Sequence, residues 1–151
     1  MQHDEEKLQV FLDGVIRFFH EFTEKEARVG TPYLMETRNP LSYDYSGIIG
    51  ISGERKGSIY FTAPANCLRD ILAAMGELNG ETENLMDLVG EVANTLSGNA
   101  RQEFGERFLI SVPTVVCSKD NHRIQLPKDT RSYIIPIEWS RHKAALVITL
   151  S

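Results

Sequence analysis

The sequence predicts an α+β protein in which a mostly antiparallel sheet carries packed helices. Three stretches have apolar residues at three- and four-residue spacing, which is typical of amphipathic helices. Most of the remaining sequence consists of short runs rich in β-branched and aromatic residues, which favour strands. A length of 151 residues suits one domain of ordinary size, so we expect a single domain over residues 1–151.

Composition and charge narrow the class of protein. The chain is 42% hydrophobic and 25% charged, as in globular proteins, and contains no low-complexity tract. Its net charge of -5 and scattered basic residues argue against binding to nucleic acid or to an anionic membrane surface. There is no apolar run of membrane-spanning length, and the N-terminal residues MQHDEEKLQV are acidic rather than leader-like. We therefore expect a cytoplasmic protein.

The three expected helices follow from periodicity and from their terminal residues. The first covers residues 4–23, and its apolar positions are Leu8, Phe11, Leu12, Val15, Ile16, Phe18, Phe19 and Phe22. Pro64 opens the second helix, where a missing N–H does no harm, and Gly76 ends it. The third helix extends over about residues 81–103. The inner side of the second helix is expected to hold Leu68, Ile71, Leu72 and Met75.

The expected strands begin with a short one at residues 33–37, followed by a loop. Residues 47–63 then predict a hairpin whose polar turn is GERKG. Further strands are expected at residues 108–117, 122–126, 132–139 and 144–150. Pro113 and Pro136 interrupt two of these runs, which indicates bulges or edge strands, because proline cannot donate to a sheet ladder.

The cysteines and histidines give no support for a metal or redox site. Cys67 and Cys117 lie fifty positions apart and belong to no C-x-x-C pair, so we expect both to be small core residues. The four histidines are dispersed, and none has another at the i+4 position. We assign no metal to this chain.

The third helix carries a polar face that needs an explanation. At 100° per residue, Asp87, Glu91, Asn94, Gly98 and Arg101 fall within an arc of roughly 80°. The apolar residues of the same segment cluster on the far side, which predicts one core face and one polar ridge: Leu85, Val89, Val92, Leu96 and Ala100. The simplest interpretation of such a ridge is a solvated face.

Two features of this helix suggest more than solvation. Glu83, Asp87 and Glu91 stand at i, i+4 and i+8 with no Lys or Arg at helical spacing, which costs a few tenths of a kcal/mol per like-charged pair. Gly90 and Gly98 each cost about 1 kcal/mol inside a helix. Close packing against a neighbouring element is one explanation for these glycines, but Gly98 faces the same side as Asn94 and leaves that surface unobstructed.

Glu91 and Asn94 are neighbours on one helical face, and the Asn side chain is suited to orienting a water rather than to attacking a substrate. Asn is neither a nucleophile nor a useful acid or base, but its carboxamide donates one hydrogen bond and accepts another. Positioning a water in line with phosphorus is a large part of phosphoryl hydrolysis. The chain has no P-loop and no evident metal ligands, so the remaining machinery would have to come with the substrate.

Three blocks of the sequence resemble the CheX family of chemotaxis phosphatases. They are GIIGISGERKGSIYF (47–61), GEVANTLSGNA (90–100) and ISVPTVVCS (110–118), in that order, and the likeness extends over nearly the whole chain. The resemblance implies a pseudo-symmetric α+β fold with two long helices side by side on the sheet. It also implies dephosphorylation of the response regulator CheY. The CheX family is related to CheC and to the flagellar-switch phosphatases.

The resemblance implies a role for each matching residue. Asn94 would orient the attacking water, and Glu91 would pair with the active-site lysine of the receiver domain. Asp87 matches the start of the CheC form of the motif, and we expect it to support or dock the partner. We group Gly90, Gly98 and Arg101 with Asp87 as partner-binding residues. The Mg²⁺ of the reaction would belong to the receiver, with no cofactor bound by this chain.

Two departures from the CheC pattern bear on this interpretation. CheC has a proline at a longer spacing after the Asn than the eighteen residues that separate Asn94 from Pro113 here, so Pro113 receives no role. The first helix lacks an acid-x-x-Asn motif, so we expect one active face, as in CheX. CheX-like proteins form dimers in which the sheets join, and the strands from Phe108 onward could supply such an edge.

Two other functions remain open from the sequence. The domain could bind a receiver or another signalling protein without hydrolysing anything, because a fold can keep an interface after its partner changes. It could also sense a ligand in a pocket between helix and sheet, although no polar cluster in the sequence supports that function.

Overall fold

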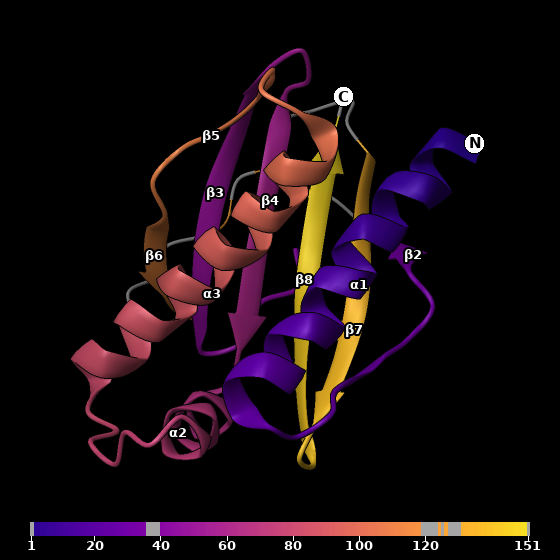
Figure 1. The fold of residues 1–151 in the computed structure, drawn as a ribbon. Helices are drawn as coiled ribbons and strands as arrows, with labels where there is room; N and C mark the ends of the chain where they lie inside the picture. Colours follow the sequence, from indigo (N-terminus) through magenta and orange to yellow (C-terminus); the bar gives the residue numbers. More distant parts are fainter. Residues whose placement is uncertain (1, 36–39, 119–123, 125, 127–130, 151) are drawn as a thin grey trace.

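The computed structural model describes residues 2–35, 40–118, 124, 126 and 131–150. The described part of the chain contains three helices and a set of antiparallel strands: four strands follow the first helix, and four follow the third (Figure 1). The helices are α1 (Gln2–Thr23), α2 (Ala65–Ala74) and α3 (Thr82–Phe104). The strands are β1 (Arg28–Val29), β2 (Tyr33–Leu34), β3 (Tyr45–Gly53), β4 (Gly57–Ala63), β5 (Phe108–Ile110), β6 (Thr114–Cys117), β7 (Arg131–Trp139) and β8 (His142–Leu150).

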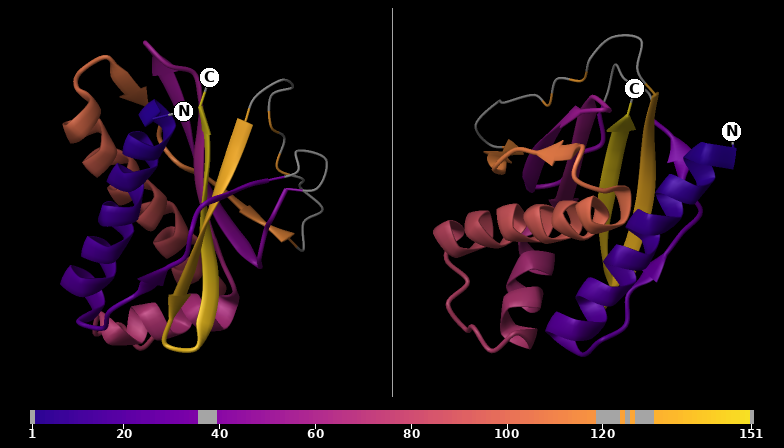
Figure 2. Two further views of the ribbon diagram at one scale, coloured as in Figure 1. Left: turned by 90° about the vertical axis from the view of Figure 1, so that its right-hand side faces the viewer. Right: turned by 45° about the horizontal axis from the view of Figure 1, so that its top comes forward.

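All eight described strands belong to one antiparallel sheet with the order β1-β7-β8-β4-β3-β5. β2 continues along β7 beyond β1, and β6 continues along β3 beyond β5. The long helices α1 and α3 lie side by side on the same face of this sheet, and α2 lies across one end (Figures 1 and 2). The predicted α+β class, with long helices on one face of a mostly antiparallel sheet, is therefore confirmed.

The two long hairpins form the centre of the sheet. β3 and β4 pair from Tyr45↔Ala63 to Ile51↔Gly57, which confirms the predicted hairpin and extends it by two residues at its start. β7 and β8 pair without a break from Arg131↔Leu150 to Trp139↔His142. The turn between β7 and β8 is shorter than predicted, because positive φ at both Ser140 and Arg141 reverses the chain within two residues.

Pro113 and Pro136 affect the sheet in different ways. Pro113 lies between β5 and β6, so the predicted 108–117 run is divided into two short edge strands. Pro136 lies inside β7 without a bulge, since the pairing with β8 stays in register there. Its carbonyl accepts a hydrogen bond from Gly30 N–H at 2.9 Å, so its ring nitrogen also faces the gap between β1 and β2. The missing N–H therefore costs no bond to β8.

The main core lies between the sheet and the helices. The inner faces of α1 and α3 supply fully buried side chains such as Phe11, Phe19 and Leu85. Cys67 and Cys117 are buried free thiols, as predicted. The prediction for Met75 was wrong: its side chain is 41% exposed, because α2 ends at Ala74 and Gly76 then turns the chain away at φ 93°.

A second, smaller core covers the opposite face of the sheet. Tyr60 is fully buried there, and its hydroxyl donates a hydrogen bond of 2.8 Å to the carbonyl of Leu41. Burial raises the pKa of Tyr60, which fits a structural phenol. The segment after β2 therefore closes one face, and α1 and α3 close the other. The predicted strand 33–37 is reduced to β2 in the described residues, and most of the predicted strand 122–126 lies outside them.

Candidate functional site

The polar residues predicted on the third helix lie together on the outer face of α3. Asp87, Glu91, Asn94 and Arg101 are exposed, and Gly98 is half-buried. The opposite face of α3 is buried in the main core: Leu85, Leu88, Val89, Gly90, Val92, Ala93, Leu96, Ser97 and Ala100. The division into a core face and a polar ridge is confirmed. We call Asp87, Glu91, Asn94, Gly98 and Arg101 the α3 ridge.

Glu91 and Asn94 are exposed neighbours, one helical turn apart. No salt bridge or hydrogen bond joins either side chain to another residue in the described part of the chain. The same is true of Asp87. An exposed carboxylate and an exposed carboxamide, both without internal partners, are free to bind a water or a group from another molecule.

The position of α3 over the sheet depends on an unusually close contact between two glycines. A Cβ on Gly47 of β3 would lie 2.4 Å from the carbonyl oxygen of Val89 and 3.0 Å from the Cα of Gly90. A Cβ on Gly90 would lie 3.0 Å from Cγ2 of Val115 in β6. The 2.4 Å distance leaves no room for a Cβ at Gly47, and the 3.0 Å distance at Gly90 would require Val115 to shift, so the two glycines set how deeply the helix sits and hence where Glu91 is held.

This contact indicates that Gly90 has a packing role instead of the partner-binding role expected from the sequence. It also places Pro113 beside Gly90. Gly90 is buried, and a Cβ there would face Pro113 at 3.7 Å as well as Val115. Gly90 therefore serves the packing of α3 against β6, and it does not lie on the surface open to a partner. Gly98 differs, because a Cβ there would meet no atom within 4 Å. The predicted clearance at Gly98 is confirmed.

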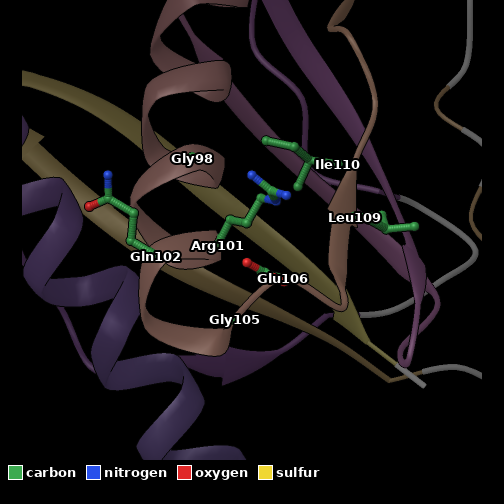
Figure 3. Close-up of a pocket in the computed structure, with 7 residues that line it drawn as sticks. All are labelled: Gly98, Arg101, Gln102, Gly105, Glu106, Leu109 and Ile110. Carbon is green, nitrogen blue, oxygen red and sulfur yellow. The ribbon is translucent and has the colours of Figure 1, made fainter.

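A cleft of about 490 Å³ begins at Gly98 and extends between the end of α3 and β5 (Figure 3). Arg101 crosses its mouth from the helix side, with its guanidinium group directed toward β5 (Figure 3). Gly105 ends α3 with φ 98° and turns the chain into β5, so that helix and strand form the two walls. The remaining lining residues were missed by sequence reasoning: Gln102, Gly105, Glu106, Leu109 and Ile110.

The described residues include no other obvious catalytic group near the ridge. No cluster of three or more His, Cys, Asp or Glu side chains among them is arranged to hold a metal ion. Burial, with a smaller contribution from the Asp70 carboxylate, raises the pKa of the Cys67 thiol to about 12, so this cysteine is not a ready nucleophile. Nor do the described helices contain an apolar stretch long enough to cross a membrane.

The fold and the α3 ridge define a class of protein related to CheC and CheX. A CheC-like superfamily protein from Shewanella sp. PV-4 is 30% identical, with a TM-score of 0.83 over 96% of this chain and 97% of that chain. The chemotaxis protein CheX from Desulfovibrio desulfuricans is 25% identical, with a TM-score of 0.83 over 97% of this chain and 99% of that chain. Comparison with curated protein sequences finds no match.

The sequence model of the family described as "Chemotaxis phosphatase CheX" matches residues 45–138, which is more than half of the chain. The chain therefore belongs to the CheX family. The fold is also shared with the CheX of a CheX–CheY–BeF₃–Mg²⁺ complex from Borrelia burgdorferi, which is 18% identical, with a TM-score of 0.74 over 95% of this chain and 96% of that chain.

Proposed function

We propose that this chain is a phosphatase that hydrolyses the aspartyl phosphate of a CheY-type receiver domain. The observation that carries the proposal is the pair Glu91 and Asn94, exposed side by side on α3 with no partner among the described residues. Membership of a family described as a chemotaxis phosphatase supports the reaction class. A CheX–CheY complex of the same fold supports the choice of partner.

Asn94 orients the attacking water in this proposal. Its amide oxygen accepts a hydrogen bond from the water, which leaves a lone pair of the water oxygen directed at phosphorus. Bringing a water into line removes much of the entropic cost of the attack. Asn94 is suited to this because the half-buried Gly98, one turn further along, has no side chain that would obstruct the approaching receiver.

Glu91 holds the receiver through an ion pair with the lysine of its active site. The carboxylate is available because no described cation neutralises it. Asp87, one turn earlier on the same face, adds negative charge beside it and supports docking. The Mg²⁺ belongs to the receiver, where it neutralises charge on the phosphoryl oxygens. The chain itself needs only to supply the α3 ridge.

The test is the decay of phosphate on a CheY-type receiver in the presence of Mg²⁺, with the parent chain and with Asn94→Ala and Glu91→Ala. We expect each substitution to slow the catalysed decay by about 100-fold, the scale of a misplaced reacting group. Asn99→Ala and Glu103→Ala are matched controls on the same helix, because both residues line a small cavity against α1 instead of the ridge. We expect the controls to keep the parent rate.

Parent-like decay with Asn94→Ala and Glu91→Ala would contradict the proposed function. Binding of the receiver by the parent chain with an unchanged phosphate lifetime would point instead to a non-catalytic binding module. The two results are separated by measuring receiver binding by titration alongside the decay.

A homodimer is part of the same proposal. β5 and β6 pair with β3 alone among the described strands, so they offer a free edge at which a second sheet could join. β7 and β8 lie inside the sheet and cannot serve in this way. Sedimentation of the chain as a monomer at micromolar concentration would contradict the dimer without affecting the assignment of Glu91 and Asn94.

A further inference from the structure

The α3 ridge continues into the cleft beside β5 without a boundary. Gly98 belongs to both, and it lies one helical turn beyond Asn94. A Cβ at Gly98 would meet nothing within 4 Å, so the path from Asn94 into the cleft is open. A molecule that covers Glu91 and Asn94 therefore also reaches the mouth of the cleft.

The two walls of the cleft differ in chemistry. β5 supplies an apolar wall through the half-buried Ile110, whose side chain is directed toward α3, whereas the side chain of Leu109 points to the other side of the strand (Figure 3). α3 supplies Arg101 and Gln102, and Arg101 makes no salt bridge with another residue in the described ranges. An apolar side chain on β5 opposite a cation that lacks an internal partner is suited to an apolar side chain next to a carboxylate.

The charges along α3 match a partner of opposite polarity. Asp87 and Glu91 make the first part of the ridge negative, and Arg101 places a positive charge at its far end, where Glu106 also lines the cleft. Glu91 and Arg101 are ten positions apart, which corresponds to about 15 Å along the helix axis. A receiver with a basic group at Glu91 and an acidic group about 15 Å away would satisfy both ends.

We propose that the cleft is a second contact region for the same receiver, and that Arg101 helps to select it. The cleft takes an apolar side chain of the receiver against Ile110, and Arg101 pairs with a neighbouring carboxylate of the receiver. This inference rests on the proposed function of Glu91 and Asn94. Arg101 acts on binding and does not touch the phosphoryl group.

The test is steady-state kinetics of Arg101→Ala and Arg101→Glu on the phosphorylated CheY-type receiver that the parent chain dephosphorylates fastest. We expect KM to rise about 5-fold with alanine and further with glutamate, while kcat stays within about twofold, because a charge at the rim of an interface mainly affects association. The KM of the parent is expected to rise more steeply with salt than that of Arg101→Ala. Ile110→Ala tests the apolar wall and is expected to raise KM as well.

Arg28→Ala is the matched control, because Arg28 is exposed on β1 at the opposite edge of the sheet. It removes the same charge and is expected to keep the parent KM. A parent-like KM and salt dependence in both Arg101 variants would overturn the inference, even if Asn94→Ala is inactive and the proposed function stands. Parent-like activity of Asn94→Ala would overturn the proposed function instead. Thermal unfolding of each variant separates a binding defect from a folding defect.

Discussion

Gly90 and Gly98 lie eight residues apart on α3 and meet opposite surroundings. Gly90 is buried, and a Cβ there would lie 3.0 Å from Val115 Cγ2 of β6, so that Val115 would have to shift. Gly98 borders the cleft, and a side chain there would meet nothing within 4 Å. Both glycines weaken the helix by a similar amount, so the reasons for keeping them must differ.

Gly90 serves packing inside the protein, whereas Gly98 lies on a surface that is open to other molecules. Gly90 is explained by the chain itself, because α3 lies so close to Val115 of β6 and to Pro113 that a Cβ at Gly90 would crowd them. No described residue lies close enough to Gly98 to exclude a side chain there. The absence of a side chain at Gly98 leaves the surface beside Asn94 open. The proposed receiver interface gives Gly98 a reason that the internal contacts of the described residues do not supply.

The largest loss of stability is expected from adding a side chain at Gly47, where β3 meets α3 beside Gly90. In Gly47→Ala the new Cβ lies 2.4 Å from the carbonyl oxygen of Val89. This oxygen belongs to the backbone of α3, so it can move away only if the whole helix shifts. We expect the free energy of unfolding to fall by about 3 kcal/mol, measured by urea denaturation. Gly50→Ala in the same strand is the control, since its Cβ would meet Ser111 Oγ at an ordinary 3.5 Å. Equal losses in both variants would contradict the packing role of Gly47.

The second prediction compares the two glycines of α3 directly. Gly98→Ala is expected to raise the free energy of unfolding by about 1 kcal/mol, the helix preference for alanine. Gly90→Ala is expected to lose that gain, because its Cβ lies 3.0 Å from Val115 Cγ2. A Val115→Ala background removes the collision and should restore part of the gain in a double-mutant cycle. A single Gly90→Ala variant as stable as Gly98→Ala would show that the contact imposes no constraint.

Local periodicity was sufficient to predict the three helices, the β3–β4 hairpin and the α3 ridge. These features depend on residues close together in sequence, and each repeats over several turns or strand residues. The same reasoning overstated the buried face of α1, where Ile16 is 37% and Phe22 is 44% exposed. Periodicity shows which side of a helix is apolar, but it does not show how far the sheet extends beneath that side.

The missed features depend on contacts between distant segments. β1 has two residues, and only its pairing with β7 identifies it as a strand. The cleft joins α3 to β5 through the turn at Gly105, so no local pattern predicts its walls. The helical wheel placed Gly98 on the polar ridge and Gly90 off it. The sequence could not show what surrounds Gly90, because the residues that occupy that space come from β3 and β6.

The smallest expected effect on stability is at Glu91, where removing the charge should slightly stabilise the protein while lowering its activity. In Glu91→Gln the repulsion between Glu91 and Asp87, one turn apart, disappears, so the free energy of unfolding should rise by about 0.3 kcal/mol at low salt. The phosphatase activity should fall in the same variant, because a neutral amide cannot replace the carboxylate opposite a lysine. Glu83→Gln is the control, since Glu83 lies in the first turn of α3, where the helix dipole favours the acid and cancels the gain. Thermal unfolding and phosphate decay measured on the same samples would decide the matter. A loss of stability in Glu91→Gln would mean that Glu91 is held within the chain, and its availability to a receiver would then need another explanation.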